Sequence, residues 1–131
     1  MSSLVRIAGA LNAADEMHQF GLILPVVVGS QVSGLTSKPV TALVDTGAHR
    51  SALDKALASS LCIEPFGSEP LDVVGGIARE VGLSSCSIGF QGGVVVKLGE
   101  VAIDDLPVFC PVIIGRDILG IGQLIVDFTQ G

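Results

Sequence analysis

The sequence predicts an all-β domain, either a sandwich or a small barrel. Short apolar runs with strand-like composition follow one another along the chain, and turn-forming residues separate them. Glycine occurs 17 times and proline 6 times in 131 residues, which favours many short strands joined by tight turns over long helices. A chain of this length is expected to form one domain with a single core.

The expected strands are apolar runs, and glycine pairs mark two of the turns. Residues 1–19 are mixed in composition and are expected to form a leader or edge segment, which leaves residues 20–131 as the folded domain. Gly75-Gly76 divides one run into two halves in the manner of a hairpin, and Gly92-Gly93 lies between two further runs. In chain order the runs are residues 21–29, 40–45, 71–83, 84–90, 93–103, 106–115 and 123–128.

Two stretches break the strand pattern and predict short helices. Residues 51–61 place apolar side chains such as Leu53 and Leu57 on one helical face, and Ser51 is a favourable N-cap. Residues 116–122 predict a single helical turn, because two glycines end the pattern soon after it begins.

The composition excludes one class of partner and suggests another. Net charge is −6 and the isoelectric point is about 4.6, and the seven basic residues are scattered, so no nucleic-acid partner is expected. Hydrophobic residues make up 49% of the chain and charged residues only 15%. Either the domain is unusually compact, or part of its apolar surface contacts another chain.

The cysteines predict neither a disulfide framework nor a metal site. Cys62, Cys86 and Cys110 are odd in number and widely spaced, and the sequence has no CxxC or Cys/His cluster. They are expected to be buried or half-buried free thiols in a reducing compartment. No metal and no cofactor are expected.

No membrane segment is expected either. No apolar run reaches the roughly 18 residues that a membrane-spanning helix needs. Residues 4–14 resemble a signal-peptide core only faintly, because almost no positive charge precedes them and two acidic residues follow directly. We therefore expect a cytoplasmic protein.

Asp45 is the first candidate functional residue. It ends an apolar run that is expected to be a buried strand, so its carboxylate should be paired or hydrogen-bonded. Thr46 and Gly47 follow at once, and Asp-Thr-Gly by itself is also an ordinary turn sequence. The interpretation of this tripeptide therefore depends on the rest of the chain.

Three motifs in a fixed order change that interpretation. LVDTGA at residues 43–48 is followed about thirty residues later by Gly75-Gly76, and IIGRD at residues 113–117 follows about seventy residues after Asp45. This set resembles the retropepsin-like (retroviral-type) aspartic proteases and, more loosely, one half of a pepsin. The resemblance spans residues 22–128, and the expected helix at 51–61 favours the cellular and bacterial-like branch.

The resemblance implies a small closed barrel-like acid protease fold with one or two short helices, assembled as a two-fold homodimer. Its implied activity is that of an aspartic endopeptidase acting on polypeptides. Peptide hydrolysis by water needs a general base and a general acid, and two carboxylates that share one proton supply both. This chain has one Asp-Thr-Gly, so the second carboxylate is expected from a second copy of Asp45 across the two-fold axis.

The resemblance also assigns roles to individual residues. Thr46 is implied to hydrogen-bond across the two-fold axis, and the Gly47 carbonyl to face the substrate. The candidate site residues are, as catalytic residues, Asp45, Thr46 and Gly47; as substrate-binding residues, Ala48, His49, Val74, Gly75, Gly76 and Ile77, the last four in a flap over the substrate; and as structural support, Ile113, Ile114, Gly115, Arg116 and Asp117.

The sequence departs from the family pattern at two positions of the Asp45 loop. Pepsin-like enzymes usually have Ser or Thr where this chain has Ala48, so one hydroxyl donor to the catalytic carboxylate is missing. Retroviral enzymes usually have an aspartate where this chain has His49, so Arg116 loses its expected partner. A pairing of Arg50 with Asp117 is one possible replacement.

Two alternatives stay open beside the endopeptidase. The fold could be kept as a catalytically weak or silent module for dimerisation or peptide binding, which the altered loop residues His49 and Arg50 favour. The third reading is a small all-β binding domain in which Asp-Thr-Gly is coincidental, which would require both motifs to arise by chance.

Overall fold

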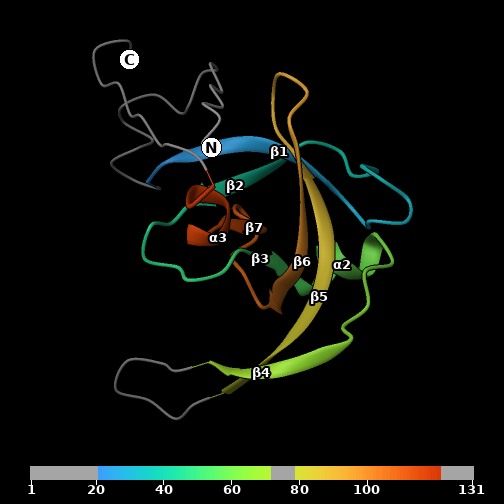
Figure 1. Ribbon diagram of the computed structural model, residues 1–131, viewed down its shortest axis with the longest axis vertical. Coiled ribbons are helices and arrows are strands. Elements are labelled where there is room, and N and C mark those ends of the chain that lie inside the picture. Colours follow the sequence, from blue (N-terminus) through green and yellow to red (C-terminus); the bar gives the residue numbers. More distant parts are fainter. Residues whose placement is uncertain (1–20, 72–78, 122–131) are drawn as a thin grey trace.

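The computed structural model describes residues 21–71 and 79–121, which form a small all-β domain with two short helices (Figure 1). The elements in chain order are β1 (Ile23–Gly29), β2 (Val40–Val44), β3 (Ala52–Asp54), α2 (Lys55–Ser60), β4 (Gly67–Leu71), β5 (Arg79–Gly89), β6 (Val95–Asp104), β7 (Val112–Ile114) and α3 (Arg116–Leu119). No helix within these ranges is both long and apolar enough to cross a membrane.

Six of the strands close into a ring. The order is β1-β2-β7-β3-β6-β5, and β1 also pairs with β5. The first half of β1 pairs antiparallel with β2, as in Val26↔Val40, whereas its second half pairs antiparallel with β5, as in Val28↔Ile88. The prediction of an all-β barrel-like fold with one or two short helices is therefore confirmed.

The interior of the ring is filled by aliphatic side chains. In β1, Val26 and Val28 are both almost fully buried, which is the alternation of a strand with one face on the core. Full burial of each such side chain stabilises the fold by roughly 1.5–3 kcal/mol. The largest fully buried side chains include Val26, Val28, Leu53, Ile88, Val101, Val112 and Ile114.

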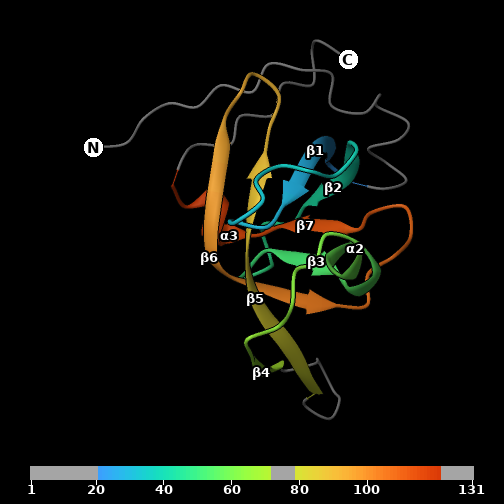
Figure 2. The same ribbon diagram turned by 90° about the vertical axis from the view of Figure 1, so that its right-hand side faces the viewer.

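β4 lies outside the ring and forms a two-stranded ribbon with the first part of β5. Its pairing runs from Gly67↔Leu83 to Leu71↔Arg79, and the ribbon extends away from the ring in both views (Figures 1 and 2). The hairpin expected over residues 71–83 therefore has paired strands on both sides, but its turn lies outside the described residues. β4 itself was not predicted, because Gly-Ser-Glu-Pro-Leu is polar, and proline suits only an edge strand.

The helix expected over residues 51–61 is shorter than predicted. α2 begins at Lys55, and its N-cap is Asp54, whose side chain accepts a hydrogen bond from Ala56 N at 3.1 Å. The preceding residues form β3, which pairs with β6 on one side and β7 on the other. Pairing to these two distant strands overrides the local helical pattern.

The strand expected over residues 106–115 is also shorter, because only Val112–Ile114 is extended in the sheet. The residues before it form a loop with a turn closed by Cys110 N and Pro107 O at 3.0 Å. Val108 in this loop is 99% exposed, so an apolar run there does not mark a buried strand. Pro107 and Pro111 supply no backbone N–H for sheet pairing.

The predicted turn at Gly92-Gly93 is confirmed, whereas the predicted burial of the cysteines is only partly correct. Gly92 and Gly93 have φ of +89° and +83° and form the turn between β5 and β6, as predicted. All three cysteines are free thiols; Cys86 and Cys110 are buried, but Cys62 is exposed, which corrects the expectation for that residue. Cys62 lies just past α2 in a left-handed conformation with φ of 58°.

Candidate active site

Asp45 lies directly after β2, where this strand pairs in parallel with β7. Its backbone N–H donates to Ile114 O at 2.9 Å, which continues the pairing of Val44 with Ile114. The half-buried carboxylate accepts a hydrogen bond at Oδ1 from Gly47 N at 2.9 Å, and Ala48 N donates to Asp45 O at 3.2 Å. The chain therefore turns tightly around the Asp45 side chain.

Residues 45–51, hereafter the Asp45 loop, join β2 to β3, and β7 lies between these two strands. Thr46 and Gly47 are exposed at the start of the loop. Farther along it, Arg116 N donates to Ala48 O at 2.8 Å, so the loop is bound on both sides of its turn to the segment formed by β7 and α3.

Ser51 fixes the far end of the Asp45 loop. Its side chain is fully buried, its N–H donates to Asp117 Oδ2 at 2.9 Å, and its hydroxyl donates to Asp117 Oδ1 at 2.7 Å. The same hydroxyl oxygen accepts a hydrogen bond from Gly115 N at 2.9 Å. The sequence had suggested Ser51 only as a helix N-cap, and its partners lie too far along the chain for a local pattern to indicate them.

Gly115 allows the close approach of these two segments. A Cβ atom at this position would lie 2.7 Å from the carbonyl carbon of Arg50 and 2.9 Å from Ser51 N. Both contacts are shorter than real Cβ atoms tolerate, and both partners are backbone atoms that cannot move aside. A side chain here would push the Asp45 loop away from β7.

The suggested pairing of Arg50 with Asp117 is wrong. Arg50 instead forms ion pairs with Glu69 of β4, at 2.9 Å, and with Glu100 of β6, at 3.3 Å. Asp117 is engaged by Ser51 and also accepts from Ile118 N at 2.8 Å. Glu69 and Glu100 were not identified from the sequence, because nothing local links them to Arg50.

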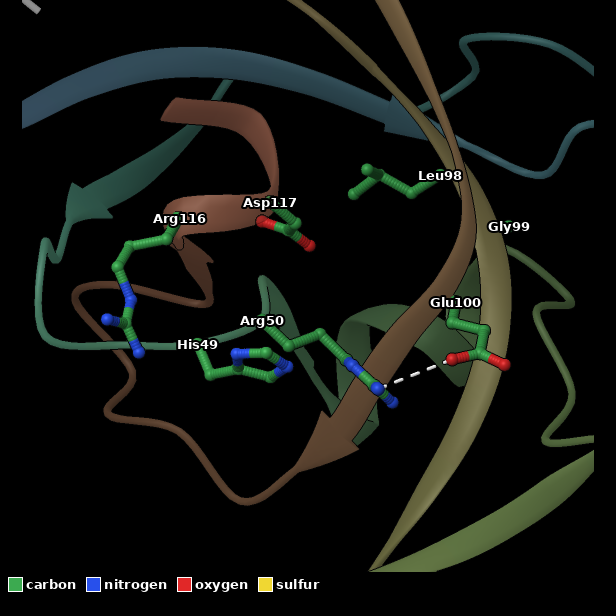
Figure 3. Close-up of a pocket in the computed structure, with 7 residues that line it drawn as sticks. All are labelled: His49, Arg50, Leu98, Gly99, Glu100, Arg116 and Asp117. Atoms are coloured by element: carbon green, nitrogen blue, oxygen red, sulfur yellow. Dashed lines mark ion pairs between the residues drawn. The ribbon is translucent and has the colours of Figure 1, made fainter. Parts of the chain in front are cut away.

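The exposed His49 and the half-buried Arg50 of the loop border a hollow of about 430 Å³ (Figure 3). In Figure 3, His49 lies between the guanidinium groups of Arg50 and Arg116, and Glu100 lies at the other side of Arg50. Arg116 is exposed and forms no ion pair with the described residues. The lining residues are His49, Arg50, Leu98, Gly99, Glu100, Arg116 and Asp117.

Asp45 is not among the residues that line this hollow, so the hollow and the candidate catalytic carboxylate are separate features of the single chain. Of the other predicted site residues, Ile113 is half-buried, and Ile114 and Gly115 are buried in or beside β7. Val74, Gly75, Gly76 and Ile77 lie outside the described residues. No group of three metal-ligating side chains occurs within residues 21–71 and 79–121.

Comparison with solved structures finds folds similar to this one among retropepsin-like proteins. EIAV protease in complex with the inhibitor HBY-793 matches with a TM-score of 0.51 and 24% identity, covering 79% of this chain and 91% of that one. A retropepsin-like aspartic protease from Rickettsia conorii matches at 0.54 and 17%, covering 81% and 76%. The retroviral protease-like domain of Ddi1 from Leishmania major matches at 0.52 and 19%, covering 82% and 81%.

These likenesses establish the retropepsin-like fold. No curated protein matches the sequence. The aspartyl protease family model matches residues 28–118, which is more than half of the chain and includes the Asp45 loop, the β4–β5 ribbon and most of α3. The chain therefore belongs to the aspartyl protease family.

Proposed function

We propose that this protein is an aspartic endopeptidase that hydrolyses polypeptides as a homodimer. The observation that carries the proposal is the placement of Asp45, at the start of an Asp-Thr-Gly loop that is hydrogen-bonded on both sides of its turn to β7 and α3. A loop bound in this way holds a carboxylate in one position, which general acid–base catalysis requires.

One Asp45 carboxylate in the proposed reaction removes a proton from water while the water attacks the peptide carbonyl. The other carboxylate protonates the amide nitrogen that leaves. Such a pair shares one proton, because two carboxylates about 3 Å apart cannot both ionise. Only one Asp-Thr-Gly occurs in the chain, so the proposal requires a second copy.

Several residues are proposed to contact the partner or the substrate. Thr46 and Gly47 are exposed at the start of the loop, which suits contact with a second copy and with a bound peptide. Ala48 and His49 follow them and are proposed to bind substrate. The flap proposed for residues 74–77 rests on the sequence resemblance alone.

The proposal is tested by replacing Asp45 with asparagine. An amide has nearly the same shape but cannot act as a base, so Asp45→Asn should abolish cleavage of an unfolded protein at mildly acidic pH. Wild-type cleavage should also stop with an active-site-directed aspartic protease inhibitor. Full activity in purified Asp45→Asn protein would overturn the assignment.

A catalytically silent peptide-binding dimer is the second candidate. It is favoured by His49, which stands where the retroviral pattern has a carboxylate, and by Arg116, which has no ion-pair partner within the described residues. Wild-type protein that binds an extended peptide without cleaving it, with affinity unchanged by Asp45→Asn, would select this candidate.

A further inference from the structure

Three charged residues from distant parts of the chain meet beside the Asp45 loop. Arg50 Nη1 lies 2.9 Å from Glu69 Oε1, and Arg50 Nη2 lies 3.3 Å from Glu100 Oε2. The Arg50 side chain is 19% exposed to solvent, whereas the side chain of Glu69 is 36% exposed and that of Glu100 is 58% exposed. The arginine is thus the most enclosed member, and an enclosed charge without its counter-charge is unfavourable.

The contact with Glu69 is coulombic. Arg50 Nη1 is fully buried and makes no hydrogen bond to the described residues, although the Glu69 oxygen is 2.9 Å away, so its N–H groups do not point at that oxygen. An ion pair of this kind depends on charge and distance and is weakened by salt when water can reach it.

Arg50 links the Asp45 loop, which is firmly bound to β7 and α3, to β4, which has few contacts with the rest of the fold. Its backbone packs on Gly115 with no room for a Cβ atom, and the next residue, Ser51, is hydrogen-bonded to Asp117. Among the strands that the structure describes, β4 pairs with β5 alone. Among the described residues, one ion pair and no side-chain hydrogen bond links β4 to any part of the fold other than β5. This ion pair is the Arg50–Glu69 contact.

We propose that Arg50 is a positioning residue that fixes the β4–β5 ribbon relative to the Asp45 loop, with Glu69 and Glu100 as its counter-charges, and so sets how tightly a polypeptide substrate binds. The kinetic part rests on the proposed peptidase function, in which the substrate is bound at Ala48 and His49, the residues directly before Arg50. The hydrogen bonds that hold Asp45 do not involve the guanidinium. Its removal should therefore release the ribbon and leave the carboxylate in place.

The kinetic experiment compares wild-type protein with Arg50→Gln and Arg50→Lys. We expect Arg50→Gln to raise KM about tenfold, equivalent to about 1.4 kcal/mol, with kcat changed less than about twofold. Arg50→Lys should lie between wild type and Arg50→Gln, because one ammonium cannot hold two carboxylates as a planar guanidinium does. Lys55→Gln is the matched control, since the Lys55–Asp105 ion pair is exposed at both ends and 3.5 Å long.

A second measurement does not depend on activity. Amide hydrogen exchange in Arg50→Gln should become faster in residues 67–71 and 79–83 but not in β2 or β7. Glu69→Gln should produce the same pattern while Arg50 keeps Glu100, which provides a variant should Arg50→Gln fail to fold. The same comparison in an Asp45→Asn background should give the same result.

The outcomes separate the two proposals. A wild-type protein without peptidase activity would overturn the proposed function, whereas the exchange pattern would still decide the positioning role. Unchanged exchange in the ribbon of Arg50→Gln would overturn the positioning role. A fall in kcat at constant KM would also overturn it, because Arg50 would then act on Asp45 itself.

Discussion

The carboxylate of Asp117 receives two hydrogen bonds from Ser51, one from the backbone N–H at 2.9 Å and one from the hydroxyl at 2.7 Å. These bonds join the end of the Asp45 loop to the first turn of α3. The Ser51 oxygen also accepts from Gly115 N, so one buried hydroxyl bonds both Asp117 and the Gly115 backbone. The loop is thereby held by a side-chain network as well as by backbone pairing.

Ser51→Ala should therefore destabilise the protein by about 1–3 kcal/mol, because Gly115 N loses its acceptor and Asp117 loses a donor in a buried site. Chemical denaturation measures the change. Ser60→Ala is the control: Ser60 is exposed, its hydroxyl donates to Leu57 O at 2.7 Å, and its loss should cost less than about 0.5 kcal/mol. Equal losses in the two variants would contradict the structural role of Ser51.

The pH dependence of cleavage should reflect the missing hydroxyl at Ala48. We expect an optimum in weak acid, about pH 4 to 6, because the charged carboxylate lacks one hydrogen-bond donor that pepsin-like enzymes have. Ala48→Ser restores a donor and should move the acidic limb of the pH–rate profile to lower pH. Ala56→Ser, in exposed helix α2, should leave the profile unchanged. A limb that stays fixed or moves upward in Ala48→Ser would contradict this account.

A shared active site has a stoichiometric consequence. After complete subunit exchange between equal amounts of wild-type and Asp45→Asn chains, about a quarter of the dimers have two carboxylates under random pairing. Activity per wild-type chain should then fall to about half of the value measured for wild-type protein that is not mixed with the variant. Total protein concentration must be matched, because dilution alone dissociates dimers. Undiminished activity per wild-type chain, with exchange verified independently, would exclude the shared site.

The three thiols should differ in reactivity. Burial and, secondarily, the charge of Asp117 raise the pKa of Cys86 from 9.0 to about 12, and burial raises the pKa of Cys110. At about pH 8 both remain protonated and poorly nucleophilic, whereas Cys62 is exposed. A thiol-reactive disulfide should therefore modify one cysteine per native chain, none rapidly in Cys62→Ser, and all three after unfolding. Rapid modification of Cys86 in folded protein would contradict its burial.

The raised thiol pKa also affects stability. Below pH 9.0 the Cys86 thiol is protonated in both folded and unfolded chains, so its burial carries no ionisation cost. Between 9.0 and about 12 the unfolded chain releases the proton while the folded chain retains it. The free energy of unfolding should consequently fall as pH rises through this window, and Cys86→Ala should remove that part of the decline.

The sequence predicted the parts of the fold that depend on local pattern. The apolar runs of β1 and β2, the turn at Gly92-Gly93 and the short turn of α3 all follow from composition and spacing. β3 was mistaken for helix, because its three residues belong to a helical pattern and become strand only by pairing with β6 and β7. Such non-local pairing leaves no signal in a short window.

The same limit applies to the candidate site. Asp45 and the IIGRD segment were identified from motif and order, and the structure places them within hydrogen-bonding distance, as Asp45 N and Ile114 O show. The partners of Arg50 could not be identified from the sequence. Glu69 and Glu100 are glutamates of a kind common on protein surfaces, and they lie in two different strands far from Arg50 in the chain. Their selection depends on how the ribbon and β6 approach the loop in three dimensions.

The divided pairing of β1 has a consequence for the order of folding. Its first half meets β2 close by in the sequence, but its second half meets β5 about sixty residues farther on, as in Val28↔Ile88. The nearer contacts lose less chain entropy and can form early, whereas the distant contacts must wait until the intervening chain is brought together. We therefore expect closure of the ring to be the slow step, and folding on the scale of milliseconds to seconds.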